Sequence, residues 1–211
     1  KQAEGVVAVL TLSDITGKSD IGPVCHGDPI MVNEGDEVEF SGQVLVAVAA
    51  TSHNLARRAA RLAHVEYQTD TPDVTIEAGW VKQSFVRPSH RQQRGDIEVG
   101  LAEAECQLDG ELQIGGQEQM YLEGQASLCI PTEEGGMLVY TSSQNPTEGQ
   151  KLVAEVLDVP MNLVTVDVRR MGGAFGGKGT NANQWACIAA LLAKKTGRPV
   201  KIRLSRADDV M

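Results

Sequence analysis

The sequence predicts a mixed α/β protein whose second half contains a βαβαβ run. Three observations support this fold class. Dense apolar runs bounded by glycine or polar residues are typical of buried strands, two segments carry helix start signals, and a glycine cluster separates a strand-like run from a helical pattern. With 211 residues and 42% hydrophobic composition, the chain is long enough to bury one or two cores.

The composition excludes several function classes. A formal net charge of −9 argues against nonspecific binding to nucleic acid or to anionic membranes, both of which need a basic surface. No apolar run approaches the roughly 20 residues of a membrane span. The opening residues KQAEGVVAVL contain no extended hydrophobic signal core. We therefore expect a cytoplasmic protein with neither nucleic acid nor a membrane as a partner.

The four cysteines give no sign of a metal site. None belongs to a CxxC pair of the kind that holds zinc, an iron–sulfur cluster or a redox dithiol, so we expect no protein metal ligands. We expect all four to be reduced, buried, small apolar residues. Cys25 and His26 are adjacent, but they fall in the turn-rich stretch GPVCHGDP and are predicted to lie in a loop.

The first elements of the chain are predicted to be two strands and a helix. GVVAVLTL (5–12) and QVLVAVAA (43–50) are apolar runs typical of strands. Thr51 or Ser52 can cap a helix that runs to about His64, with an apolar face of leucines and alanines. VEYQ and VTIEAGW follow, so we expect this part to be β-rich with one crossover helix.

We expect the chain to divide into two domains. Residues 1–81 form the first domain, and residues 98–211 form the second. The segment 82–97, KQSFVRPSHRQQRGDI, is polar, locally basic and interrupted by proline and glycine, which is typical of a linker.

The second domain is predicted to open with an antiparallel pair. VGLAEAECQLDGELQIG (99–115) and QMYLEGQASLCIP (119–131) are strand-like and flank the glycines at 115 and 116. MLVYTSS (137–143) is predicted to be the next strand.

A helix is predicted directly after this strand. Asn145 supplies an N-cap, Pro146 a first-turn proline and Glu148 a carboxylate at the third helical position, and the helix should run to about Asp158.

Two further strands and one helix complete the βαβαβ run. The strands are LVTVDVRR (163–170) and PVKIRLSR (199–206), and the helix between them spans about 181–195. Such a run favours parallel strands, so the loops after Ser143 and after Arg170 should emerge at the same carboxyl-end edge of a sheet, where ligands bind in α/β folds.

Polar groups from these two loops are predicted to converge. Gln144 stands just before the helix cap, and the backbone amides around Ala174, Phe175 and Gly176 should face the same crevice. Fixed N–H donors suit a ligand rich in oxo and phosphate oxygens. In the plainer alternative, the glycines only permit a tight turn, and Gln144 is an ordinary loop residue.

A P-loop nucleotide site is a second alternative. Gly172, Gly177 and Lys178 satisfy the GxxxxGK pattern, but Gly179 occupies the position of the hydroxyl that binds magnesium. No clear apolar run ending in aspartate supplies the second magnesium anchor. Both departures argue against a P-loop.

Four ordered motifs resemble a known family. GGQEQMYLEGQ, SSQNPTEGQ, RRMGGAFGGKGT and KKTGRPVKIRL are similar in order and spacing to the large, molybdenum-binding subunit of the xanthine dehydrogenase and aldehyde oxidase family. EVEFSGQVLVAVAAT and AARLAHVEYQ resemble its α/β hammerhead domain. The resemblance implies a hammerhead-type domain over 1–81, expected to lack its first strand, and the N-terminal part of a molybdopterin-binding domain over 98–211.

The resemblance also implies site residues. Gln144 is the candidate catalytic residue and would hydrogen-bond an oxo ligand of the molybdenum, while the amide of Phe175 would contact the same region. Gly172 would help to shape the glycine loop. The cofactor would be bound by Gln144 together with these loop residues: Gly173, Ala174, Phe175, Gly176 and Gly177. In this family the pterin dithiolene holds the molybdenum, so no protein side chain need ligate the metal.

The implied activity is hydroxylation of a purine-type heterocycle with oxygen from water, with electrons passing to iron–sulfur and FAD subunits or domains. Xanthine-oxidising members usually have GGKE where this chain has GGKG, so Gly179 replaces a substrate-binding glutamate. An aldehyde oxidase-like enzyme and a non-catalytic scaffold are the alternatives. The family's catalytic glutamate motif and most pterin-binding segments do not occur in this sequence, so we expect a fragment that is inactive alone and lacks bound cofactor.

Overall fold

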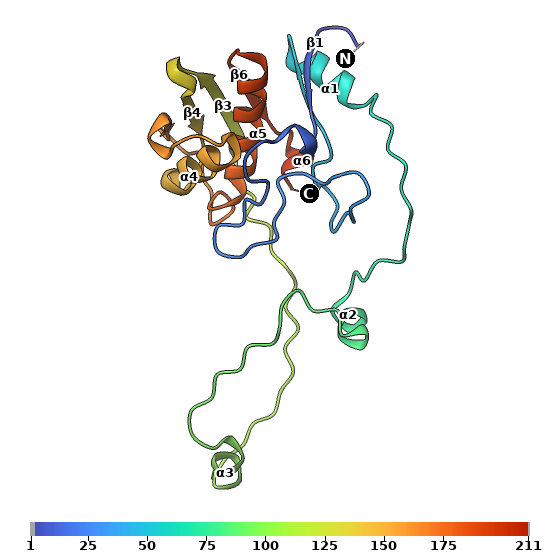
Figure 1. Cartoon of the computed structure of the whole chain (residues 1–211). Coiled ribbons are helices and arrows are strands. Elements are labelled where there is room, and N and C mark those ends of the chain that lie inside the picture. The colour runs from blue at the N-terminus through green and yellow to red at the C-terminus, as the bar shows by residue number, and fades with distance from the viewer. Residues whose placement is uncertain (1–2, 211) are drawn as a thin grey trace. The chain divides into compact units, whose positions relative to one another are not determined.

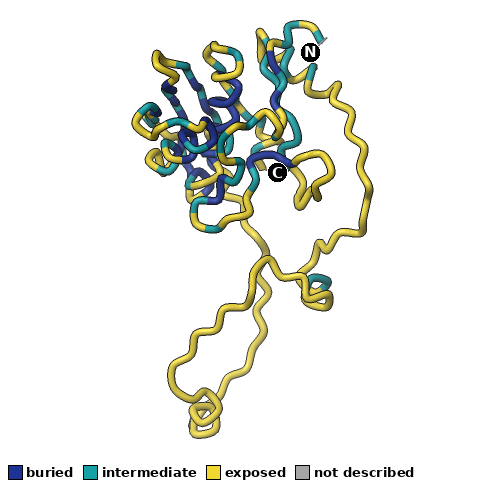
Figure 2. Tube along the Cα trace, viewed as in Figure 1, coloured by how far each residue is buried: buried dark blue, intermediate teal, exposed yellow. Residues whose placement is uncertain are grey.

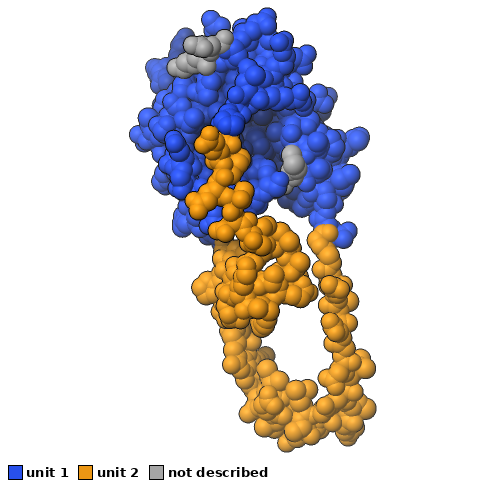
Figure 3. Space-filling view, turned by 90° about the vertical axis from the view of Figure 1, so that its right-hand side faces the viewer, with its two compact units in different colours: residues 1–64, 117–211 blue, residues 65–116 orange. Residues whose placement is uncertain are grey.

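The computed structural model describes residues 3–210, which cluster into two compact units (Figures 1 and 3). The larger unit combines the described residues up to His64 with those from Gln117 onward, and the smaller unit comprises Val65–Gly116. The predicted domain boundaries at residues 81 and 97 stay predictions, because compact units follow spatial contacts and not the order of the chain.

A four-stranded sheet organises the larger unit. Its strand order is β5 (Val164–Asp167), β4 (Met137–Thr141), β3 (Ala126–Pro131) and β6 (Val200–Arg203). β4 and β5 are parallel neighbours, whereas β3 runs antiparallel to both β4 and β6. The strands of the βαβαβ run therefore share one direction as predicted, but β3 lies between β4 and β6 in the opposite direction.

Two helices cover one face of the sheet (Figure 1). They are α4 (Pro146–Leu157) and α5 (Asn181–Thr196). The alternating burial of β3 and β4 sends Cys129 and Val139 to this face, where both are fully buried. The core is concentrated between the sheet and these helices (Figure 2).

The predicted start of α4 is confirmed. The Asn145 side chain caps the helix by accepting a hydrogen bond of 3.2 Å from the Glu148 amide, and Pro146 occupies the first turn. The helix ends at Asp158, which adopts a left-handed conformation with φ of 53°. α5 ends in the same way at Gly197, with φ of 64°, where glycine carries no Cβ penalty.

A separate two-stranded antiparallel sheet packs against α5. It consists of β1 (Val6–Leu10) and β2 (Ala47–Ala50), so β2 begins later than predicted. Helix α1 (His53–Ala60) follows, and Ser52 Oγ accepts its capping bond of 3.3 Å from the Leu55 amide. The helix ends before the predicted His64.

Two sequence predictions for the smaller unit are wrong. Residues of VTIEAGW form a second helix, α2 (Ile76–Lys82), because Thr75 caps it through a 3.1 Å bond from the Ala78 amide. This part is therefore less β-rich than expected. The antiparallel pairing of 99–115 with 119–131 is also wrong, because β4 and β6 occupy both edges of β3.

Part of the 99–115 segment is instead helical. α3 (Ile97–Ala102) begins at Asp96, whose side chain accepts a 3.2 Å bond from the Val99 amide. Nearly all residues of the smaller unit are exposed (Figure 2). The remaining short elements of the chain are the 3-10 helices η1 (Leu12–Asp14), η2 (Glu133–Gly135) and η3 (Met161–Leu163) and the helix α6 (Arg206–Asp209).

Candidate functional site

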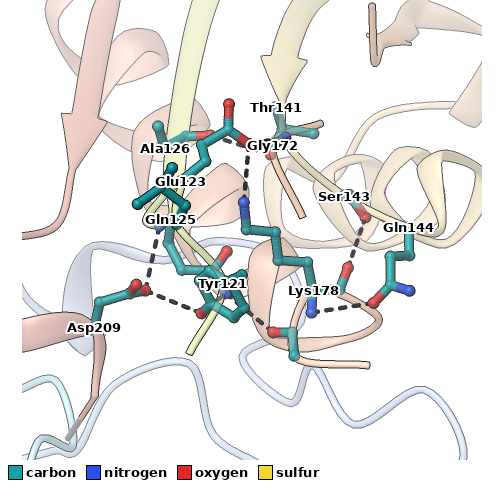
Figure 4. A network of polar contacts seen from close by, with 12 residues as sticks. Tyr121, Glu123, Gln125, Ala126, Thr141, Ser143, Gln144, Gly172, Lys178 and Asp209 are labelled. Atoms are coloured by element: carbon teal, nitrogen blue, oxygen red, sulfur yellow. Dashed lines mark hydrogen bonds and ion pairs between the residues drawn. The ribbon is translucent and has the colours of Figure 1, made fainter. Parts of the chain in front are cut away.

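The two loops predicted to converge lie beside each other. The backbone N–H of Gln144 donates a 2.8 Å hydrogen bond to the Lys178 carbonyl. The side-chain oxygen Oε1 of Gln144 accepts a 3.3 Å bond from the backbone N–H of Lys178 (Figure 4). The loops meet because β4 and β5 are adjacent and parallel, so their carboxyl ends open at the same edge.

The bond to Lys178 fixes the orientation of the Gln144 carboxamide. A backbone N–H can donate only to the carbonyl oxygen, so that oxygen must face Lys178. The Nε2 group consequently points away from the loop, as Figure 4 shows. Because Gln144 is exposed, this group offers an N–H donor at the sheet edge.

The glycine loop presents a row of unpaired amides. Among the described residues, Gly173, Ala174, Phe175 and Gly176 donate no backbone hydrogen bond, although the next amide, of Gly177, donates to Ala174 O at 2.8 Å. Gly173 and Gly176 have φ of 93° and 98°, which glycine adopts readily. Consecutive free N–H groups in such a turn attract anionic oxygens.

Phe175 is conformationally unusual. It has φ of 52°, a left-handed value that is strained for a bulky side chain, and the residue is 76% exposed. Packing of the aromatic ring therefore does not explain the strain. Strained residues of this kind concentrate at functional sites.

A fully buried lysine lies beneath this loop. Lys178 has no exposed surface, and its Nζ bonds Glu123 Oε2 at 2.9 Å and lies 4.7 Å from the centre of the Tyr121 ring (Figure 4). Glu123 Oε2 also accepts a 3.0 Å bond from the Gly172 amide. Burial favours a higher pKa for the Glu123 carboxyl, but the bonds from Gly172 and Lys178 outweigh burial and lower that pKa.

A second set of polar contacts supports the loop from the same segment. Gln125 Nε2 donates to Tyr121 Oη at 3.0 Å and to Gly177 O at 3.1 Å, and Tyr121 Oη donates to Asp209 Oδ1 at 3.1 Å. Burial, followed by the nearby Asp209 charge, raises the pKa of Tyr121. A Cβ at Gly177 would lie 2.6 Å from Tyr121 Cε1, so the loop packs directly on this segment.

Sequence reasoning missed the roles of Glu123 and Lys178. From the sequence, Glu123 was given no part in the site, and Lys178 was considered only as a P-loop lysine. A glycine-rich loop packs closely against its neighbours, so a lysine within it is a candidate for burial. Fully buried lysines are nearly always paired, and Lys178 was therefore the residue whose sequence context pointed to a carboxylate partner. The observed pairing also leaves the Lys178 ammonium unavailable for a phosphate.

Gly179, which stands where the family resemblance implies a substrate-binding glutamate, is half-buried and has space for a Cβ atom. The nearest atom to a Cβ built there is Gly176 O at 3.6 Å, which is ordinary contact.

The four cysteines are free thiols that differ in burial. Cys129 and Cys187 are buried as predicted, but Cys25 is only half-buried and Cys106 is exposed, so the expectation of four buried cysteines is wrong. The Cys25–His26 stretch does form a loop, in which the Asp20 carboxylate accepts bonds from the amides of Gly22, Gly27 and Asp28. Within residues 3–210, no group of three or more His, Cys, Asp or Glu side chains is placed to bind a metal.

None of the helices in the described part of the chain combines the length and apolarity needed to cross a bilayer.

Two family profiles together match most of the chain. Residues 81–211 match the molybdopterin cofactor-binding domain, and residues 1–71 match the a/b hammerhead domain of aldehyde oxidase and xanthine dehydrogenase. Among solved structures, quinoline 2-oxidoreductase from Pseudomonas putida 86 is similar in fold, with a TM-score of 0.79 at 22% identity over 98% of this chain and 28% of that one. Aldehyde oxidoreductase from Desulfovibrio gigas gives a TM-score of 0.80 at 21% identity, over 99% of this chain and 24% of that one.

Curated relatives show higher identity. Xanthine dehydrogenase from Blastobotrys adeninivorans is 39% identical over 100% of this chain and 15% of its own length. Xanthine dehydrogenase/oxidase from Gallus gallus is 37% identical over 98% of this chain, and aldehyde oxidase 4 from Cavia porcellus is 37% identical over 98%, each over 15% of its own length. The chain thus spans about a sixth of these relatives. The chain belongs to the xanthine dehydrogenase and aldehyde oxidase family, and most of it matches that family's molybdopterin cofactor-binding domain.

Proposed function

We propose that this chain forms one wall of the molybdopterin site of a molybdenum hydroxylase. The observation that carries the proposal is the orientation of Gln144, whose carbonyl oxygen bonds Lys178 and whose Nε2 is left as an outward donor. Beside it, the amides of Gly173, Ala174, Phe175 and Gly176 have no described acceptor.

These donors fit the proposed cofactor chemically. Molybdopterin carries oxygen ligands on its metal and a phosphate, all of which accept hydrogen bonds, and the loop offers N–H groups without a competing carboxylate. The dithiolene of the pterin holds the metal in this family, so protein ligands are not required. When bound, the cofactor supplies the metal centre at which a substrate carbon is hydroxylated with oxygen from water. Gln144 and the loop amides would orient its oxygen ligands.

We further propose a purine-type heterocycle as the substrate, with an aldehyde as the alternative, and iron–sulfur and FAD subunits or domains as the electron-accepting partners. The names of the relatives support both substrate classes, since they include xanthine dehydrogenases and aldehyde oxidases. Gly179 favours the aldehyde alternative, because it removes the carboxylate that the family resemblance assigns to purine binding.

Replacement of Gln144 by glutamate tests the proposed site. Gln144→Glu keeps an oxygen that accepts from the Lys178 amide but removes the outward N–H donor. In the natural, complete protein we expect turnover to fall about 100-fold, the scale measured for loss of one preorganised donor. Gln113→Glu, an exposed site in the smaller unit, is the matched control and should retain full turnover.

Metal analysis separates the enzyme from the scaffold alternative. The complete protein, produced in a host that makes molybdopterin, should contain molybdenum, and protein that never acquires it would favour the scaffold. Unchanged turnover in Gln144→Glu would refute the assigned role.

Gly179→Glu tests the substrate class. A Cβ at this position makes only an ordinary contact of 3.6 Å with Gly176 O. We expect the ratio of xanthine to aldehyde turnover to rise in this variant. An unchanged ratio would show that Gly179 does not set the preference.

A further inference from the structure

We propose that Glu123 and Lys178 are positioning residues that together set the placement of the Gln144 donor and the glycine-loop amides. The inference rests on the proposed function, and it concerns two residues that hydrogen-bond the glycine loop or Gln144. In Figure 4 the backbone of Lys178 lies beside Gln144, and the Lys178 side chain extends away from Gln144 toward Glu123.

Glu123 holds both ends of the glycine loop. A single carboxylate oxygen, Glu123 Oε2, accepts the Gly172 amide at 3.0 Å and Lys178 Nζ at 2.9 Å. The Glu123 amide also donates to Gly172 O at 3.3 Å. Four amides between these ends bond no described residue, so the directions of their N–H groups depend on how the two ends are placed.

Lys178 also positions Gln144. Two hydrogen bonds join the backbone of Lys178 to Gln144. The Lys178 N–H donates to Gln144 Oε1, and the Lys178 carbonyl accepts a bond from the backbone N–H of Gln144. Ser143 Oγ also donates to the same carbonyl at 3.4 Å. A shift of Lys178 therefore displaces both the glycine loop and the carboxamide that faces away from it.

The ion pair is unusual because one of its two side chains is fully buried. The Lys178 side chain is fully buried while the Glu123 side chain is 43% exposed, so the lysine has no water to replace a lost partner. A methionine would fill nearly the same space without a desolvation cost. The charged lysine is therefore explained by its directional bond to Glu123 and not by packing alone.

The experiment uses the natural, complete protein and two readouts. Lys178→Met removes the bond to Glu123, whose exposed carboxylate water can solvate, so the variant should fold. We expect hydrogen exchange of the Gly177 and Lys178 amides to rise about tenfold or more, the effect of losing a bond between charged groups. Turnover should fall by about the same factor, while exchange in α4 stays unchanged.

Two further variants complete the test. Lys18→Met removes an exposed lysine that bonds Glu155 at 3.0 Å, remote from the loop, and should change neither readout. The double variant Lys178→Met with Glu123→Gln leaves no unpaired charge. If the double variant restores thermal stability but not slow loop exchange or turnover, positioning is supported over a purely structural role.

Wild-type loop exchange or wild-type turnover in folded Lys178→Met overturns the inference. If Gln144→Glu lowers turnover in the same assay, the inference alone has failed. If Gln144→Glu leaves turnover unchanged, the proposed function has failed, whereas the exchange measurement still reports whether the ion pair fixes the loop.

Discussion

Replacement of Gly177 by alanine should destabilise the protein mainly through a clash with Tyr121, although the added Cβ would also lie 3.3 Å from both Ala174 O and Gln119 Cδ. Gly177 does not have a positive φ, so alanine is conformationally allowed there. The added Cβ would lie 2.6 Å from Tyr121 Cε1, whereas carbon atoms pack best at about 3.5–4.0 Å. Relief of the clash requires a displacement of about 1 Å in the ring or the loop.

That displacement is costly because the ring is fixed on several sides. Tyr121 is 4% exposed, and its hydroxyl bonds Asp209 and Gln125. Overpacking of such a site costs about 1–3 kcal/mol. For a chain of this length, each kcal/mol lowers the melting temperature by about 2–4 °C.

Thermal and urea unfolding measure the loss of stability in Gly177→Ala. Two comparisons test whether the Tyr121 contact causes this loss. Gly179→Ala is the matched control, because its Cβ meets only Gly176 O at 3.6 Å, and it should stay within about 0.5 kcal/mol of wild type. In a Tyr121→Ala background, Gly177→Ala should cost at least about 0.5 kcal/mol less than in wild type. Equal costs in both backgrounds, or equal stability of the two single alanine variants, would show that the Tyr121 contact is not the cause.

Three further predictions test the core, a helix cap and the thiols. Leu192 in α5 is buried, so Leu192→Ala should lower the free energy of unfolding by about 2–5 kcal/mol in urea denaturation. Leu108→Ala, at a 98% exposed site, is the control and should change this free energy by less than about 0.5 kcal/mol. Asn145→Ala should cost about 1 kcal/mol because it removes the α4 cap, and an unchanged urea midpoint would contradict this role. Burial raises the pKa of the Cys129 thiol to about 12, so it stays protonated at about pH 8, and mass spectrometry should find native alkylation at exposed Cys106 but not at Cys129. Modification of Cys129 before unfolding would contradict its burial.

The sequence by itself determined the features that depend on neighbouring residues. The start of α4 was predictable because Asn145, Pro146 and Glu148 act within one helical turn. The meeting of Gln144 with the glycine loop followed from two parallel βα connections, since parallel neighbours open their loops at one edge. The motifs that carry the family resemblance were equally visible.

Only the tertiary structure decided which distant groups became partners. The position of β3 between β4 and β6 could not be read locally, because strand-like residues do not specify which edge they pair with. The ion pair of Glu123 with Lys178 joins residues 55 positions apart, and the sequence pattern around Lys178 indicated only a P-loop lysine. Local preferences act over a few residues, whereas burial of a charge becomes favourable only once the folded chain supplies its partner.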